Sequence, residues 1–120
     1  MYTKILIASD GSATAAKAAA RGADLARAVG AEVVLVYVGD EAAGVKVLDK
    51  VKQDLGVDAK TRIVQGDPAD QILGVAEAEG ADLVVVGNKG MTGAKRFLLG
   101  SVPNQISHHA PCNVLIVKTT

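Results

Sequence analysis

The sequence predicts an α/β fold in which an open, five-stranded parallel sheet carries helices on both faces. Short apolar runs such as Lys4–Ser9, Val33–Val38 and Asn113–Val117 have the length of strands. Their continuous apolar character is typical of strands that are covered on both sides. Segments with helical spacing of apolar residues alternate with these runs, which favours parallel strands joined by helical crossovers. Right-handed crossovers then leave few possible topologies for the sheet.

Length and composition favour one packed domain over residues 1–120, because the chain has 120 residues and 49% of them are hydrophobic. The 13 basic and 13 acidic side chains balance, so no general field attracts nucleic acid or a membrane surface. The single cysteine, Cys112, excludes an internal disulfide and a multi-cysteine metal site. The first residues lack the apolar length of a signal peptide, and no run approaches the ~20 apolar residues of a membrane span. We therefore expect a cytoplasmic protein.

The first strand, Lys4–Ser9, is followed by an alanine-rich helix that extends to Val29. Asp10 or Ser12 can cap its start, and Gly30 stands where a helix is expected to end. The face predicted to pack on the sheet is made mostly of small residues, so this helix can lie close to the strands. These residues are Ala15, Ala18, Ala19, Gly22, Leu25, Ala26 and Val29.

The middle of the chain repeats the strand–helix alternation. Val33–Val38 reads as a buried strand, and Glu41–Leu55 has apolar residues at helical spacing before Gly56. Thr61–Val64 is shorter and more polar, which favours an edge strand. The third helix begins with Asp67 as cap and Pro68 in the first turn. Its inner face is predicted to hold Ala69, Ile72, Leu73 and Ala76, and Gly80 ends it.

The last part of the chain contains a glycine-rich stretch between two strands. Asp82–Val86 is the predicted fourth strand, and the stretch GNKGMTGAKRFLLGSVP follows it from Gly87 to Pro103. A short helix is expected near Pro103–His109, before the fifth strand, Asn113–Val117.

Ligands of open parallel sheets bind beyond the carboxyl ends of the strands, at the point where the winding reverses. Ala8–Gly11 and Gly87–Gly90 would meet at this point if strands one and four are neighbours. Glycines let the backbone approach a ligand, and the helix start at Gly100–Ser101 offers free N–H groups to an anion. Lys89, Lys95 and Arg96 can supply positive charge. The glycine spacing alone leaves a phosphate cradle and a capped surface loop equally open, because the Walker GKS or GKT sequence is absent.

The spacing Gly87-x2-Gly90-x9-Gly100-Ser101 resembles the nucleotide motif of the universal stress protein family, G-x2-G-x9-G-(S/T), at every defined position. SDGS after the first strand, GDPADQIL before the third helix, ADLVVVGNKG, and LLGSV with APCNVLIV also look like that family. The resemblance covers nearly the whole chain. It implies a Rossmann-like, three-layer sandwich of the adenine nucleotide alpha hydrolase-like type, with the strand order 3-2-1-4-5.

The resemblance also implies where an adenine nucleotide would bind. The triphosphate would follow the glycine-rich stretch, Asp10 would lie near the ribose and phosphates, where nucleotide-bound Mg²⁺ can join it, and the backbone of Val38 would meet adenine. Ala8 and Ser9 would form the floor. The implied nucleotide-binding residues are Ala8, Ser9, Asp10, Val38, Gly87, Asn88, Lys89, Gly90, Gly100, Ser101 and Val102.

Two features depart from the family pattern. Relatives that bind ATP usually carry Ser or Thr after the GSV segment, whereas this chain has Pro103, which offers neither a hydroxyl nor an N–H. The loss of one phosphate contact favours AMP or cyclic AMP over ATP. The connection between the second and third strands is also short, about twenty residues, whereas family members often have a longer stretch there, so the cover over adenine is reduced.

We expect an adenine-nucleotide-binding protein of the stress response that acts as a sensor or ligand reservoir. No general base or nucleophile emerges, so no catalytic residue is predicted and any ATP hydrolysis should be slow. The alternative is a nucleotide-free homodimeric interaction module. A nucleotide hydrolase or a flavoprotein is disfavoured, and a receiver domain is excluded because Val64-Gln65-Gly66 lacks the required Asp. The family resemblance implies a homodimer formed through Asn113–Val117.

Three further features have structural interpretations. His108 and His109 are adjacent, lack a third ligand at metal spacing, and are expected at a solvated helix end. Cys112 is expected to be a buried structural thiol, because no base is placed beside it. Phe97, Leu98 and Leu99 are expected to anchor the glycine-rich stretch on the sheet.

Overall fold

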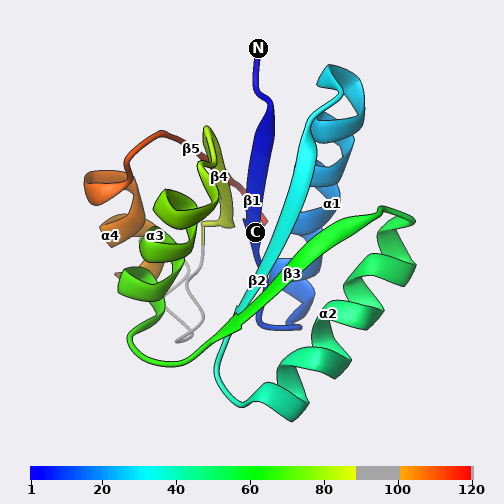
Figure 1. Cartoon of the computed structure of the whole chain (residues 1–120), viewed down its shortest axis with the longest axis vertical. Helices are drawn as coiled ribbons and strands as arrows, with labels where there is room; N and C mark the ends of the chain where they lie inside the picture. Colours follow the sequence, from blue (N-terminus) through cyan, green and yellow to red (C-terminus); the bar gives the residue numbers. More distant parts are fainter. Residues whose placement is uncertain (89–100, 120) are drawn as a thin grey trace.

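The structure is a computed structural model, and it describes residues 1–88 and 101–119. Strands and helices alternate along the chain and form one sheet with helices on both faces (Figure 1). The elements are β1 Lys4–Ala8, α1 Ala13–Val29, β2 Glu32–Val38, α2 Glu41–Leu55, β3 Ala59–Val64, α3 Pro68–Glu79, β4 Leu83–Gly87, α4 Ser101–His109 and β5 Asn113–Val117.

The sheet has the predicted order, β3-β2-β1-β4-β5, and all its strand pairs are parallel. β1 is central, since it pairs with β2 through Ile7↔Leu35 and with β4 through Ile7↔Val85. The two edges are β3 and β5. The expectation of an edge position for the short polar third strand is thus confirmed.

Two apolar layers fill the space between the sheet and its helices (Figure 1). Alternate residues of β1 serve opposite layers, so Ile5 and Ile7 contact the α1–α2 side, whereas Leu6 and Ala8 contact the α3–α4 side. Small residues of α1 bring that helix close to the strands. A Cβ added at Gly22 would lie 2.8 Å from Cδ1 of Ile7, so only glycine fits this contact without a shift.

Helix boundaries follow the capping residues. Ser12, and not Asp10, is the N-cap of α1, because its Oγ accepts a hydrogen bond from the N–H of Ala15 at 3.1 Å. Asp67 caps α3 in the same way, at 3.1 Å from the N–H of Asp70. Gly30 and Gly56 follow α1 and α2 with φ of 71° and 62°, the left-handed conformation that glycine adopts readily.

Several predicted boundaries were wrong by one or two residues. β3 begins at Ala59, because register with β2 at Val33 extends it beyond its apolar part. β4 ends at Gly87 and excludes Asp82, whose side chain instead binds backbone near β1. β1 ends at Ala8, and α4 already starts at Ser101. The inner face of α3 buries Val75 together with Ala69, Ile72 and Ala76, whereas Leu73, which was predicted on this face, is half-buried.

Candidate functional site

The carboxyl ends of β1 and β4 lie side by side, and α1 and α4, the helices that come next in the described chain, lie on opposite faces of the sheet (Figure 1). β1 leads into α1 on one face, whereas the segment after β4 leads to α4 on the other, where Val102 and Ile106 join the α3–α4 layer. The winding therefore reverses between these two strands, as it does where doubly wound sheets bind ligands. We call residues 8–12 and 87–88 the switch point.

The turn after β1 is held by hydrogen bonds within itself and to β2. Ser9 is fully buried, donates its N–H to the carbonyl of Val36 at 3.1 Å and accepts the N–H of Gly11 on its Oγ at 3.2 Å. Gly11 has φ of 85°, which allows the chain to turn sharply here. Ser9 thus shapes the floor of the switch point and is covered by its own turn.

Asp10 lies half-buried at the rim of the same turn. Its Oδ1 accepts the N–H of Ser12 at 2.9 Å. Its Oδ2 receives no hydrogen bond from the residues that the structure describes, so this oxygen can accept a ribose hydroxyl or join a cation held by phosphates. In residues 1–88 and 101–119, no three His, Cys, Asp or Glu side chains come together as a metal-binding group. Within residues 8–12 and 87–88, which the structure describes, Asp10 is the one carboxylate that could contact a cation.

The end of β4 is tied to the segment that follows β5. The N–H of Asn88 donates to the carbonyl of Val117 at 2.9 Å. The side-chain oxygen of Asn88 accepts both the N–H of Thr119 at 2.9 Å and the Thr119 hydroxyl at 2.8 Å. Thr119, which sequence reasoning missed, is buried with 8% of its surface exposed. A polar residue just after an apolar strand is the only signal that could have indicated it.

The other predicted residues are divided between the described and the undescribed parts of the chain. Val38 ends β2 and is half-buried, next to Gly39, whose N–H donates to the carbonyl of Val64 at 2.8 Å. Ser101 is exposed in the first turn of α4, where Val102 and Pro103 are buried. The remaining predicted residues lie outside the described residues: Lys89, Gly90 and Gly100, with Lys95, Arg96 and Phe97–Leu99.

A small cavity of about 250 Å³ borders the switch point on the α2 side. Ser9, Gly11 and Ser12 line it from the turn, and Lys46 and Lys50 line it from α2. Lys50 already pairs with Asp54 at 3.0 Å on an exposed helix face. The cavity therefore adds space beside the turn, with one cation, Lys46, that has no ion pair among the described residues.

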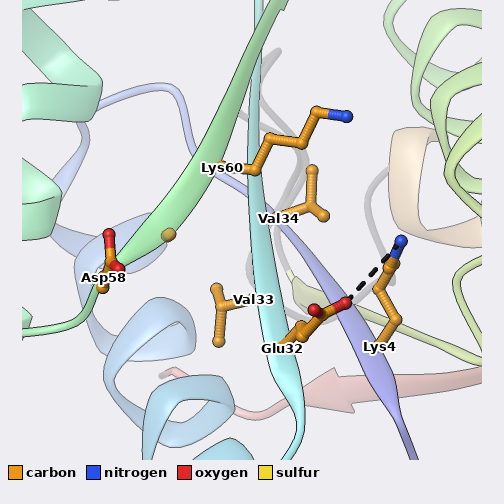
Figure 2. A pocket seen from close by; sticks show the side chains of 7 residues that line it. Lys4, Glu32, Val33, Val34, Asp58 and Lys60 are labelled. Carbon is orange, nitrogen blue, oxygen red and sulfur yellow. Dashed lines mark ion pairs between the residues drawn. The ribbon is translucent and has the colours of Figure 1, made fainter.

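A larger cavity of about 480 Å³ lies at the opposite, amino-terminal end of the sheet (Figure 2). Figure 2 shows that Lys4 points toward Glu32, and their charged atoms are 3.8 Å apart. Lys60 pairs with Glu79 at 3.0 Å. Both lysines of this cavity are thus engaged with carboxylates, which makes it a poor site for an anionic ligand.

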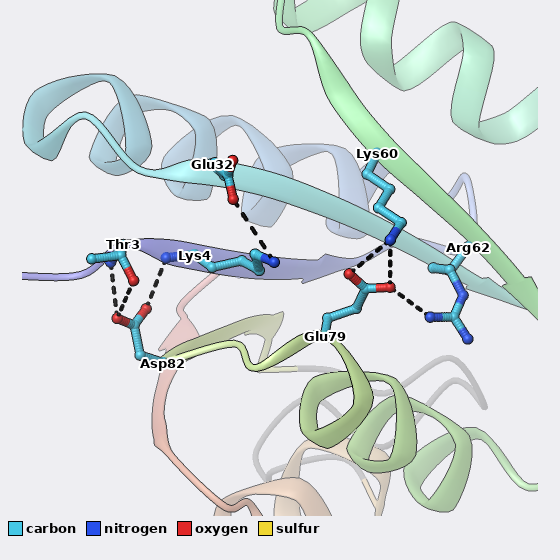
Figure 3. Close-up of polar contacts among 7 residues, drawn as sticks. All are labelled: Thr3, Lys4, Glu32, Lys60, Arg62, Glu79 and Asp82. Carbon is cyan, nitrogen blue, oxygen red and sulfur yellow. Dashed lines mark hydrogen bonds and ion pairs between the residues drawn. The ribbon is translucent and has the colours of Figure 1, made fainter.

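Two carboxylates fasten elements together near this cavity (Figure 3). Glu79, at the end of α3, lies between Lys60 and Arg62 of β3, and its side chain is 6% exposed. Hydrogen bonds from Lys60 and then Arg62 lower the pKa of the Glu79 carboxyl below its ordinary value. Backbone hydrogen bonds from Thr3 and then Lys4 lower the pKa of Asp82. These carboxylates have structural roles at the end of the sheet opposite the switch point.

The histidines and the cysteine lie away from the switch point. His108 and His109 are exposed in the last turn of α4, as predicted. Cys112 is half-buried, whereas a buried structural thiol was expected. It lies just before β5, where desolvation, and then the charge of Asp82, raise the pKa of its thiol. A raised pKa disfavours the thiolate, which argues against a nucleophilic role.

The fold and the switch point define a doubly wound α/β protein with its candidate site between β1 and β4. The chain belongs to the universal stress protein family, whose sequence profile matches residues 1–53 and 40–118. Universal stress protein YxiE of Bacillus subtilis is 34% identical over 148 residues, covering 98% of this chain and 100% of the relative. No helix in the described part of the chain is long and apolar enough to cross a membrane.

Solved structures of other proteins share this α/β fold over nearly the whole chain. A universal stress protein in complex with cAMP superposes with a TM-score of 0.87 at 30% identity, covering 99% of this chain and 98% of that one. The protein MJ0577 superposes with a TM-score of 0.83 at 31% identity, covering 100% and 98%. These structures have the α/β fold that the sequence predicted.

The comparisons also bear on the short connection between the second and third strands. The alignment with YxiE extends over 148 residues, whereas this chain has 120, so YxiE carries residues that this chain lacks. The two profile matches overlap over residues 40–53, within α2. This overlap indicates that the missing residues belong near α2, which agrees with the expected shortening.

Proposed function

We propose that the protein binds an adenine nucleotide at the switch point and acts as a sensor or ligand reservoir in a stress response. The observation that carries this proposal is the adjacency of the ends of β1 and β4, because the glycine motif starts at Gly87, the last residue of β4. The universal stress protein solved with cAMP supports it, since that protein is 30% identical to this chain.

The proposed contacts follow the chemistry of the residues. The phosphates bind along the motif of Gly87, Gly90 and Gly100–Ser101, where backbone N–H groups and the positive end of α4 favour an anion. Asp10 accepts a hydroxyl of the ribose, or contacts Mg²⁺ that the phosphates bring with them. Ala8, Ser9 and the backbone of Val38 contact the adenosine. Asn88, Lys89 and Val102 are the remaining residues of the proposed nucleotide site.

The proposal does not include fast catalysis. Asp10 is the only titratable side chain that the described part of the switch point offers, and a hydrolase needs a positioned base or an activated water. Any ATP hydrolysis is therefore slower than about 1 per second, the low end of typical turnover numbers. Retention and release of the nucleotide, rather than its conversion, then carry the signal.

Isothermal titration calorimetry with ATP, AMP and cyclic AMP, with and without Mg²⁺, tests the proposal. At least one nucleotide should bind with Kd below about 1 mM, which corresponds to ~4 kcal/mol. Gly100→Leu should abolish the binding, because its side chain would fill the phosphate path. Gly74→Leu is the matched control, since Gly74 is exposed on α3 with no atom within 4 Å of an added Cβ. Failure of all three nucleotides to bind the wild-type chain would refute the proposal.

A second candidate function is a nucleotide-free homodimer that pairs through β5. The apolar residues Val114–Val117 are all half-buried rather than buried, although they form a strand of the sheet. β3, the other edge strand, carries the charged side chains Lys60 and Arg62, which discourage pairing with another chain. β5 has no charged side chain along its length, so it is the edge better suited to a partner strand.

A further inference from the structure

The two ends of β4 are held by matching pairs of hydrogen bonds. Before the strand, Asp82 accepts the N–H of Thr3 at 2.8 Å and the Thr3 hydroxyl at 3.1 Å through one oxygen, Oδ2 (Figure 3). After the strand, Oδ1 of Asn88 accepts the N–H of Thr119 at 2.9 Å and the Thr119 hydroxyl at 2.8 Å. We call these pairs the Asp82–Thr3 clasp and the Asn88–Thr119 clasp.

The Asn88–Thr119 clasp lies where β4 ends and the glycine motif begins. Its threonine is buried, whereas Thr3 of the other clasp is exposed. The N–H of Asn88 also donates to Val117 at 2.9 Å, and the ammonium of Lys17 lies 3.5 Å from the carbonyl oxygen of Thr119. Contacts from α1, β4 and the segment after β5 therefore converge on this one point.

The clasp determines what the Asn88 side chain can do. An amide oxygen has two lone pairs, and the two donors of Thr119 occupy both of them. This oxygen is therefore not available to accept hydrogen bonds from a nucleotide. Its hydrogen bonds instead fix the backbone of Gly87 and Asn88 relative to the end of β5.

We propose that Asn88 and Thr119 are positioning residues that set nucleotide affinity by holding the end of β4 in place. This inference rests on the proposed function, and it adds Thr119, which lies outside the predicted site. A phosphate-binding backbone gains affinity when its N–H groups are already oriented, because less ordering is needed on binding. Loss of the Thr119 hydroxyl should therefore weaken nucleotide binding without removing any group that touches the ligand.

The test compares Thr119→Val, Thr119→Ser and Thr3→Val with the wild type by calorimetry, using cyclic AMP, AMP and ATP. Thr119→Val keeps the shape but loses one hydrogen bond, and we expect a Kd about fivefold higher. Thr119→Ser keeps the hydroxyl and should bind within twofold of wild type. Thr3→Val removes the matching hydroxyl at the opposite end of β4 and should leave the Kd unchanged.

The controls separate positioning from general destabilisation. Equal weakening by Thr119→Val and Thr3→Val would overturn the inference, because a global loss of stability would then explain both. Wild-type affinity in Thr119→Val would overturn it as well. Melting temperatures of the unliganded variants show how much stability each hydroxyl contributes, and a positioning role requires the Kd to change only at position 119.

Amide hydrogen exchange provides a readout that needs no nucleotide. The amide of Asn88 should exchange about fivefold faster in Thr119→Val than in the wild type, and at an unchanged rate in Thr3→Val. An unchanged rate in Thr119→Val would refute the clasp. If the wild-type chain binds no nucleotide, the proposed function fails, and the exchange rate of Asn88 alone decides whether the clasp holds the end of β4.

Discussion

Pro103 follows the GSV segment, at the position where we expect relatives that bind ATP to carry Ser or Thr. It lies buried in the first turn of α4, where the absence of an N–H costs the helix nothing because that donor has no partner within the helix. The substitution is therefore compatible with the fold. The consequence concerns ligand binding. Pro103 offers neither a hydroxyl nor an N–H, so the protein has two fewer hydrogen-bond donors near the proposed phosphate path.

Replacement of Pro103 by Ser should favour ATP over nucleotides with fewer phosphates. The new hydroxyl can donate one hydrogen bond to a phosphate, so calorimetry should show about fivefold tighter ATP binding and little change for AMP. Pro68→Ser, in the first turn of α3, is the matched control and should change neither affinity. An unchanged ratio of ATP to AMP affinity in Pro103→Ser would contradict the role assigned to Pro103.

Glu79 is expected to make the stability of the protein sensitive to acid. Its pKa is lowered in the fold by hydrogen bonds from Lys60 and Arg62, so the ionised carboxylate stabilises the folded state above the unfolded pKa of about 4.3. This contribution is lost as the pH falls through the lowered pKa. Glu79→Gln should thus reduce the melting temperature at pH 7, and the difference from wild type should shrink toward pH 3.

The exposed pair Lys50–Asp54 serves as the control for this experiment. Its side chains are 75% and 60% exposed, so water screens their attraction. Asp54→Asn should change the melting temperature little at either pH. A constant difference between Glu79→Gln and wild type from pH 7 to pH 3 would show that the ionised form of Glu79 does not stabilise the fold.

Individual side-chain partners were the least predictable part of the molecule. Asn88 was selected from the motif, but its partner Thr119 is 31 residues away, and no local pattern links the two. Asp10 and Ser12 were equally good caps by sequence. The structure distinguishes them because Ser12 reaches the N–H of Ala15, whereas Asp10 accepts the N–H of Ser12.

At the scale of elements, local sequence signals predicted most of the helix and strand boundaries. The predicted bounds of α2 and β5 match the structure, because caps and glycines end α2 and an unbroken apolar run defines β5. β3 was predicted two residues too short at its start. Ala59 and Lys60 join it through pairing with β2, a tertiary effect that overrides their weak strand propensity.

β5 supports a prediction about assembly. Ile116→Lys would place a charge on the strand through which we expect two chains to pair, and should convert a dimer into a monomer in size-exclusion chromatography with light scattering. Thr61→Lys, at an exposed position of β3, is the matched control and should leave the mass unchanged. Circular dichroism shows whether each variant is folded. A folded Ile116→Lys chain with the mass of the wild-type dimer would exclude β5 as the interface.

At the scale of the whole molecule, the two ends of the sheet have different characters. The amino-terminal end holds a cavity whose lysines are engaged with carboxylates, and the Asp82–Thr3 clasp and ion pairs fasten its elements together. The carboxyl end holds the switch point, where the glycine motif begins at Gly87, and a carboxylate oxygen of Asp10 without a partner among the described residues. The formal net charge is zero, so attraction for a nucleotide has to come from this local arrangement.

The most direct test of this account is a map of backbone amide chemical shifts during titration of the labelled protein with cyclic AMP. We predict that the largest changes fall at Ala8–Asp10, Val38, Gly87–Asn88 and Ser101–Val102. Ala8, Val38 and Gly87 end three neighbouring strands at the carboxyl end of the sheet, and Val102 lies in the apolar layer that contains Ala8. Shift changes confined to the cavity around Lys4, Glu32 and Lys60, or no changes at millimolar nucleotide, would contradict the proposal that the switch point binds a nucleotide.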